Sequence, residues 1–173
     1  MNSNVIKCLM QVASYLKVPS GKIQIDSNLV PIRITNDSTT KGFISIIFEL
    51  LNEAKLSINK ALDVAEARQW LEYAILYVAR ADGSQNVEQV LKELNNLLST
   101  KTYLVSYNIS IADVVLFYMM HHIFVNLSYL DKEKYLNVSR WFDNVQQDAL
   151  VRQKNSMIEF KTNYLTVVAP AKH

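Results

Sequence analysis

Apolar and polar positions follow two different spacings in the first third of the chain. From Val5 to Leu16 the apolar residues recur every three or four positions, which predicts an amphipathic helix. Pro19 and Gly21 then predict the end of that helix. Two short β-branched segments follow, Lys22–Ile25 and Leu29–Ile34, and both indicate strands. This part of the chain is therefore predicted to be mixed α/β.

The second predicted strand contains a proline, which restricts where it can lie. Pro31 has no backbone N–H to donate, so we expect it at a sheet edge, at a bulge or after a cis bond. The polar segment 36–40 predicts a turn, and the apolar face of 42–54 predicts a second helix.

The remainder of the chain is predicted to be an array of helices. Between Phe43 and Ala169 there is no proline, and Gly83 is the only glycine. Apolar periodicity and turn residues divide this stretch into a long helix over 60–80, a helix opened by a capping box at 86–89, a very apolar helix from Ser110 to about Leu127, a helix striped by Tyr135, Val138, Phe142 and Val145, and a short helix over 155–165.

Composition narrows the class of protein. The chain has 173 residues, 50% of them hydrophobic and 20% charged, which is typical of one globular domain or of two small ones that share a core. The net charge is +2, and the basic residues are not concentrated in one part of the chain, so direct nucleic-acid binding is not expected. The longest apolar run near the middle, 114–120, is too short for a membrane helix, and the N-terminus lacks the charge of a signal peptide. We therefore expect an intracellular protein that does not contact membranes.

Candidate metal and thiol chemistry is sparse. Cys8 is the only cysteine, which excludes a disulfide framework or a thiolate zinc site within the chain. His121 and His122 point about 100° apart on a helix and have no carboxylate or thiol three or four residues away, so we expect no metal. Cys8 falls in the middle of its predicted helix at the edge of the apolar stripe, where a small semi-buried hydrophobic role is favoured.

The segment Ser110–Asp113 carries the most specific local signal. A serine N-cap accepts a backbone N–H of the third helical residue, and the carboxylate of that residue reaches back to the serine N–H. Because the following helix is nearly all apolar, its first turn is expected to be buried, so Ser110 and Asp113 are assigned a structural capping role.

Placed after a helical array and before Val114–Tyr118, this cap resembles the buried capping element of the glutathione S-transferase C-terminal domain. The resemblance implies a mostly α, glutathione S-transferase-like fold with a reduced thioredoxin-like α/β N-terminal domain over 1–54, whose Val30-Pro31 matches the family's characteristic proline. It also implies an all-helical C-terminal domain over 60–165 and a flexible tail over 166–173.

A closer resemblance lies in five segments, namely 69–73, Tyr103-Leu104, Tyr107-Asn108, Ala112-Asp113 and, most specifically, 133–142. They are similar to the transferase-like adaptors of the multi-aminoacyl-tRNA synthetase complex. That resemblance implies a non-catalytic adaptor in the cytoplasm that docks the transferase-like domains of methionyl-tRNA synthetase and of glutamyl-prolyl-tRNA synthetase, beside other components of the complex. It also implies a second location in the nucleus, with a role in DNA-damage signalling.

The same resemblance implies two docking surfaces. In transferase-like dimers the helices matching 42–54 and 60–80 form a shared face, and its candidate residues here are Glu49, Glu53, Arg68 and Tyr73. Tyr73 is spaced along one helix with Trp70 and Tyr77. The sequence leaves two roles open for these three side chains, namely packing in the core and forming a stripe at an interface.

The second implied surface is centred on Arg140, with Asn137 from the same segment. Arg140 lies two residues from both Val138 and Phe142, about 200° around the helix from each, so we expect it to face solvent. In the family the matching arginine meets the glutamyl-prolyl enzyme, a role that suits a guanidinium because it pairs with carboxylates.

A glutathione-dependent transferase or peroxidase is the alternative function. Such an enzyme needs a catalytic residue at the end of a first strand, but here no strand is predicted before Val5. It also needs a hydroxyl at the opening of the last N-domain helix to receive the glutathione carboxylate, where this chain has Gly42-Phe43. We therefore expect no catalytic residue, no cofactor and no metal.

Overall fold

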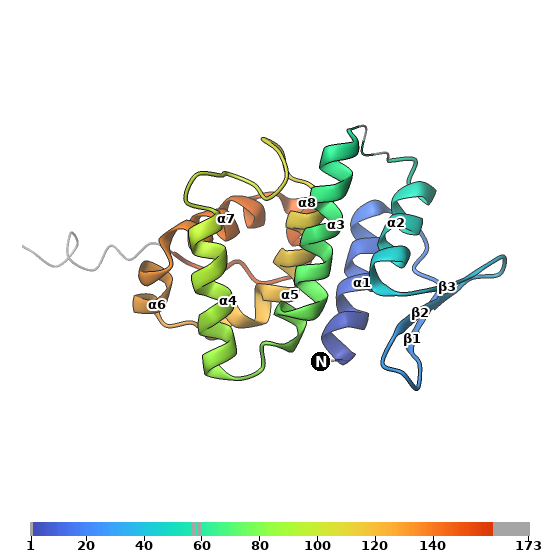
Figure 1. Cartoon of the computed structure of the whole chain (residues 1–173), viewed down its shortest axis with the longest axis horizontal. Helices are drawn as coiled ribbons and strands as arrows, with labels where there is room; N and C mark the ends of the chain where they lie inside the picture. The colour runs from blue at the N-terminus through green and yellow to red at the C-terminus, as the bar shows by residue number, and fades with distance from the viewer. Residues whose placement is uncertain (1, 57, 59, 161–173) are drawn as a thin grey trace, which may run out of the picture.

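The N-terminal elements form a small sheet with two helices. The structure, a computed structural model, describes residues 2–56, 58 and 60–160. An antiparallel sheet of order β1-β2-β3 lies at one end of the molecule in Figure 1, and helix α1 lies between this end and the helical array. The bounds of these elements are α1 Asn2–Leu16, β1 Lys22–Ile25, β2 Pro31–Ile34, β3 Thr39–Lys41 and α2 Phe43–Glu53.

The rest of the described chain is helical, and α5 runs through its middle (Figure 1). Residues 111–120 of α5 are all buried, which fits the apolar run 114–120 and the capping role assigned to Asp113. The predominance of helices confirms the predicted mostly α class. The elements are α3 Ala61–Leu76, the 3₁₀ turn η1 Val78–Arg80, α4 Ser84–Leu97, α5 Ile111–Asn126, α6 Tyr129–Lys134, α7 Leu136–Gln147 and α8 Ala149–Arg152. Among the described residues, no helix is long and apolar enough to cross a membrane.

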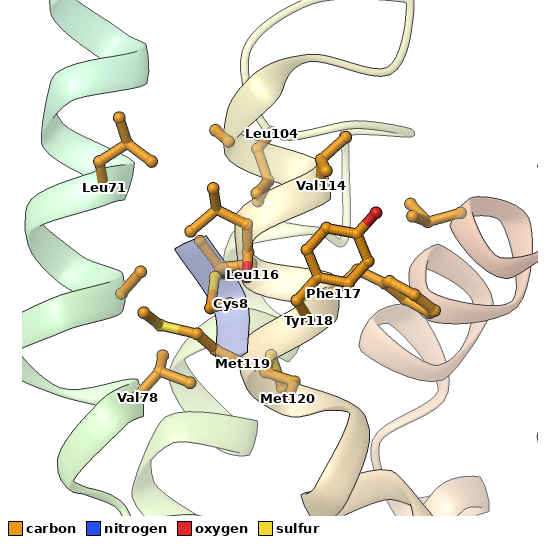
Figure 2. Packing of buried hydrophobic residues seen from close by; sticks show 14 of the residues in the cluster. Cys8, Leu71, Val78, Leu104, Val114, Leu116, Phe117, Tyr118, Met119 and Met120 are labelled. Atoms are coloured by element: carbon orange, nitrogen blue, oxygen red, sulfur yellow. Dashed lines mark hydrogen bonds between the residues drawn. The ribbon is translucent and has the colours of Figure 1, made fainter. Parts of the chain in front are cut away.

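One hydrophobic core joins the N-terminal elements to the helical array. The apolar stripe of α1 contacts both α2 and α5, and α3 packs along α5. Figure 2 shows Cys8 of α1 among buried side chains that include Leu71 of α3 and Leu116 of α5. Each large aliphatic side chain fully buried in this way contributes about 1.5–3 kcal/mol, so α1 is held mainly by its packing.

The sheet differs from its prediction at both ends of β2. Pro31 is the first residue of the central strand, not an edge residue, and no peptide bond among the described residues is cis. Leu29 lies in a left-handed turn at φ 62°, where the side chain of Asp26 accepts the N–H of Asn28 and of Val30. The predicted turn over 36–40 ends in β3, because Thr39 and Thr40 pair with β2 and do not need an apolar face of their own.

The helical array differs from its prediction in several places, and α8 is one element that was not predicted. The helix predicted over 60–80 ends at Leu76 and continues as η1, and α6 was not predicted. The capping box predicted at 86–89 is wrong, because α4 begins at Ser84 with Gly83 as its N-cap. The helix predicted over 155–165 is wrong for 155–160, whose backbone is instead bonded by side chains of α5 and α7; residues 161–165 and the predicted tail 166–173 lie outside the described residues.

Candidate interaction surfaces

Arg140 is exposed on α7, as the sequence predicts, but its guanidinium turns back toward the end of α4. Its Nη2 donates to the carbonyl oxygens of Leu98, at 2.8 Å, and of Lys101, at 3.0 Å. Leu98 is the C-cap of α4, where carbonyls lack helical partners and the helix dipole is negative. Arg140 therefore stabilises a helix end while remaining accessible.

Asn137, the other candidate on α7, is engaged by α4 as well. Its backbone N–H donates to Asn95 Oδ1 at 2.8 Å, and its side-chain Nδ2 donates to the carbonyl of Asn95 at 3.1 Å. The N–H of Val138 reaches the same Asn95 Oδ1 at 3.3 Å. The side chain of Asn95, on α4, thus caps the N-terminus of α7. The N-cap residue of α7 itself, Tyr135, makes no capping bond with its side chain. Asn137 is half-buried and contacts α4 more than solvent.

Glu49 and Glu53 both bind a buried arginine of the sheet. The two carboxylate oxygens of Glu53 accept from Arg33 Nη1 and Nη2 at 2.6 and 2.8 Å, and Glu49 Oε2 lies 3.0 Å from Nη1. Arg33 is 1% exposed and also donates to the carbonyls of Ser20 and Pro19. These hydrogen bonds fix α2 to β2 and to the turn after α1.

The electrostatics of this cluster follow from those contacts. The hydrogen bond to Glu53 raises the pKa of Arg33 despite its burial, so the guanidinium stays charged. Burial raises the pKa of Glu49, but hydrogen bonds from Thr40, Arg33 and Ser38 outweigh it and leave that pKa below its ordinary value. The carboxylates that the resemblance assigns to a docking surface are therefore already paired within the chain.

Arg68 and Tyr73, the other two candidates of that surface, contact different neighbours. The Arg68 guanidinium lies 4.2 Å above the ring of Phe48, a cation–π contact between α3 and α2. Tyr73 is half-buried and donates its hydroxyl to Glu93 of α4 at 2.9 Å, while burial raises the pKa of Tyr73. The structure brings Arg68 to the α2 side of α3 and Tyr73 to the α4 side.

The aromatic stripe on α3 combines the two roles left open by the sequence. The ring of Tyr73 packs against Trp70 and Tyr77, with centroids 5.8 and 5.2 Å away. The same residues, with Leu76 and Leu97, line a groove between α3 and α4, and Tyr77 is 56% exposed. This groove is a solvent-exposed aromatic surface of the kind enriched in binding sites.

Asp113 is fully buried and confirms the predicted capping box. Its Oδ2 accepts the N–H of Ser110 at 2.9 Å and the Ser110 hydroxyl at 2.6 Å, and Ser110 Oγ accepts the Asp113 N–H. The second carboxylate oxygen accepts from Leu104 N and from Trp141 Nε1, at 3.0 and 2.8 Å. Asp113 therefore joins Leu104, in the segment between α4 and α5, to α5 and α7, which the local motif did not reveal.

The positions expected to handle glutathione are apolar. Phe43 opens α2 and is buried, and Gly42 offers no side chain to cap the helix. The Cys8 thiol is 1% exposed, and burial raises its pKa, which disfavours the reactive thiolate. Within residues 2–56, 58 and 60–160, no group of three or more histidine, cysteine or acidic side chains could hold a metal ion.

The sequence patterns did not single out Arg33 or Asn95. A signal for Arg33 was present, because Glu49 and Glu53 are one helical turn apart on a mostly apolar helix, where two like charges repel and a cation between them is favourable. For Asn95 there was no signal, since an asparagine inside a helix is ordinarily solvent-exposed and its partners lie 42 residues away.

Comparisons with known proteins agree with this architecture. A family model described as nuclear-export cofactor Arc1p matches residues 63–149. Eukaryotic translation elongation factor 1 epsilon-1 of Cricetulus griseus is 38% identical over 140 residues, covering 79% of this chain and 80% of the relative, and that of Homo sapiens is 36% identical with the same coverage.

Two more distant similarities extend the comparison. The tRNA-aminoacylation cofactor arc1 of Schizosaccharomyces pombe is 25% identical over 130 residues, covering 73% of this chain and 27% of the relative. A solved structure titled a possible glutathione S-transferase from Rhodopseudomonas palustris superposes with a TM-score of 0.71 at 16% identity, covering 99% of this chain and 94% of that one. At that identity the similarity shows the fold alone.

Proposed function

Because the chain belongs to the family of eukaryotic translation elongation factor 1 epsilon-1, we propose that it is a non-catalytic cofactor of tRNA aminoacylation that binds aminoacyl-tRNA synthetases. The observation that carries this proposal is 36–38% identity over 140 residues to proteins of that name. The fission-yeast relative, named a tRNA-aminoacylation cofactor, supports the same process.

The finer proposal is an adaptor of the multi-aminoacyl-tRNA synthetase complex with two docking faces. One face, formed by α2 and the α2 side of α3 with Arg68, takes the transferase-like domain of methionyl-tRNA synthetase. The other, around Arg140 on α7, takes that of glutamyl-prolyl-tRNA synthetase. Arg140 supports the second face because it is an exposed cation held in a fixed position. The adaptor acts in the cytoplasm, and a nuclear role in DNA-damage signalling is part of the same proposal.

The test uses purified full-length chain and the two purified transferase-like domains. Isothermal titration should give saturable binding of each domain, and a preformed complex with one domain should still bind the other. Arg140→Ala should weaken binding of the glutamyl-prolyl domain at least tenfold and leave the methionyl domain unaffected. Arg80→Ala, at another exposed arginine, is the matched control and should change neither. Failure of the wild-type chain to bind either domain would overturn the proposal.

A glutathione-dependent enzyme is the second candidate, favoured by the transferase-like fold. The buried thiol of Cys8 and the apolar opening of α2 argue against it. Calorimetric titration of the chain with glutathione should show no saturable binding at millimolar concentration, and a conjugation assay should show no turnover. Saturable binding below about 1 mM, near the upper range of enzyme KM values, would favour the enzyme.

A further inference from the structure

The two candidate residues of α7 are both held by the last turns of α4. Asn95 accepts the N–H groups of Asn137 and Val138, which are in the first turn of α7. One helical turn further on, Arg140 Nη2 donates to the carbonyls of Leu98 and Lys101. The start of α7 and the guanidinium of Arg140 are thus fixed to the same short stretch, residues 95–101.

We propose that Asn95 is a positioning residue for the α7 docking face: it fixes the first turn of α7 so that the carbonyls at the end of α4 hold Arg140 ready for an acidic group of the partner. This inference rests on the proposed function, in which Arg140 meets a synthetase domain. Asn95 itself is half-buried beneath α7 and acts on the partner only through Arg140.

The geometry leaves part of Arg140 available for such a partner. Both carbonyls are bonded by Nη2, and within the described residues Nε and Nη1 make no hydrogen bond. A guanidinium has five N–H donors, so a carboxylate can still bind the outer edge. An arginine that is already ordered loses less side-chain entropy when it binds, which strengthens association without adding a contact.

The chemistry of Asn95 explains why an asparagine serves here. Its Oδ1 lies at the N-terminus of α7, where the first N–H groups lack helical partners. An aspartate would offer the same acceptor, and its negative charge suits a helix N-terminus. An alanine would leave both N–H groups without this partner and allow the first turn to fray.

A double-mutant cycle tests the proposal. Asn95→Ala should weaken binding of the glutamyl-prolyl domain about fivefold, which corresponds to about 1 kcal/mol, the usual value of a helix N-cap. In an Arg140→Ala background the same change should alter the affinity less than twofold, because there is no longer a guanidinium to position. Asn95→Asp should restore the affinity to within twofold of wild type, and binding of the methionyl domain should be unchanged throughout.

Asn96→Ala is the matched control, since Asn96 is the next residue of α4 and its exposed side chain makes no hydrogen bond within the described chain. A second readout needs no partner: NMR relaxation of the Arg140 guanidinium should show an ordered side chain in the wild type and in Asn95→Asp, and a mobile one in Asn95→Ala.

The outcomes separate this inference from the proposed function. If Asn95→Ala weakens binding by the same factor with and without Arg140, or leaves the Arg140 side chain equally ordered, the positioning role is wrong although the adaptor stands. If the wild-type chain binds neither domain, the adaptor is wrong, and an unchanged Arg140 relaxation in Asn95→Ala would overturn the positioning role as well.

Discussion

At the scale of single residues, Asp113 is the polar group on which the helical array most depends. Its carboxylate accepts hydrogen bonds from Ser110, Leu104 and Trp141, and it is fully buried. We predict that Asp113→Ala lowers the free energy of unfolding by about 3 kcal/mol or more, because it leaves several buried donors without an acceptor. Urea unfolding followed by fluorescence measures this. Ser110→Ala should cost only about 1 kcal/mol, the usual value of an N-cap.

Partner binding by the Asp113→Ala variant should fall only as far as folding does. At a temperature where the variant is still folded, its affinity for each synthetase domain should match that of the wild type. A variant that melts like wild type but loses a partner would show that Asp113 is an interface residue and that the capping role is secondary.

The ion pair between Glu49 and Arg33 predicts how stability depends on pH. The net pKa of Glu49 lies below its ordinary value of 4.5. Its contribution to stability is therefore fully present above pH 4.5 and is lost as the pH falls through the lowered pKa of the folded state. We predict that wild-type stability falls more steeply below that pH than the stability of Glu49→Gln. Denaturant midpoints between pH 6 and pH 3 measure this, and parallel curves would contradict it.

How much of the site could be predicted from sequence depends on how far apart in the chain the hydrogen-bonding residues lie. The Ser110–Asp113 box was predictable because both partners lie within one turn of one helix. Arg33 pairs with Glu53 across 20 residues and Asn137 with Asn95 across 42, so their geometry exists only after the elements pack. The composition of α2 hinted at the first pair, while nothing local distinguished Asn95.

At the scale of elements, the packing of α7 against α4 changes what Arg140 is expected to do. Seen as an exposed charge, it should contribute little to stability. Because Nη2 bonds two carbonyls at the end of α4, we instead predict that Arg140→Glu lowers the free energy of unfolding by about 1 kcal/mol, since a carboxylate there would face those carbonyls.

Thermal melting and titration with the synthetase domains check the Arg140→Glu prediction together. Binding of the glutamyl-prolyl domain should fall at least tenfold, while the methionyl domain binds as before. Loss of both partners to the same extent would indicate misfolding or one shared surface. An unchanged melting temperature would show that the two hydrogen bonds from Arg140 to carbonyl oxygens make no net contribution to stability.

Elements were predictable where periodicity was long and uninterrupted. The stripes of α1 and α5 gave helices whose bounds differ from the structure by only a few residues. The short strand β3 was not predictable, because it depends on pairing with β2. The irregular segment 155–160 likewise depends on side-chain bonds from His121 and Gln146, which replace the hydrogen bonds of a helix.

At the scale of the whole molecule, the N-terminal elements and the helical array share one core. The buried cluster runs without a break from α1 and α2 into α3 and α5. The sequence resemblance divides the chain at about residue 54, but the packing offers no separate core for the sheet, in which Pro31 and Ile32 are the buried apolar side chains. A small sheet of that kind is not expected to be stable alone.

A single core predicts a single unfolding transition, and the two tryptophans allow this to be tested. Trp70 and Trp141 both lie in the helical array, so their fluorescence reports on that part of the chain. We predict that Glu53→Ala, which removes a partner of buried Arg33 at the far end of the molecule, lowers the melting temperature seen by tryptophan fluorescence and by far-ultraviolet circular dichroism equally. A loss of about 1–2 kcal/mol corresponds to about 2–8 °C for a chain of this size. Glu72→Ala, at an exposed glutamate of α3, is the control and should melt like wild type. If the fluorescence midpoint of Glu53→Ala stays at the wild-type value while the dichroism signal begins to fall earlier, the sheet and α2 unfold on their own and the core is divided.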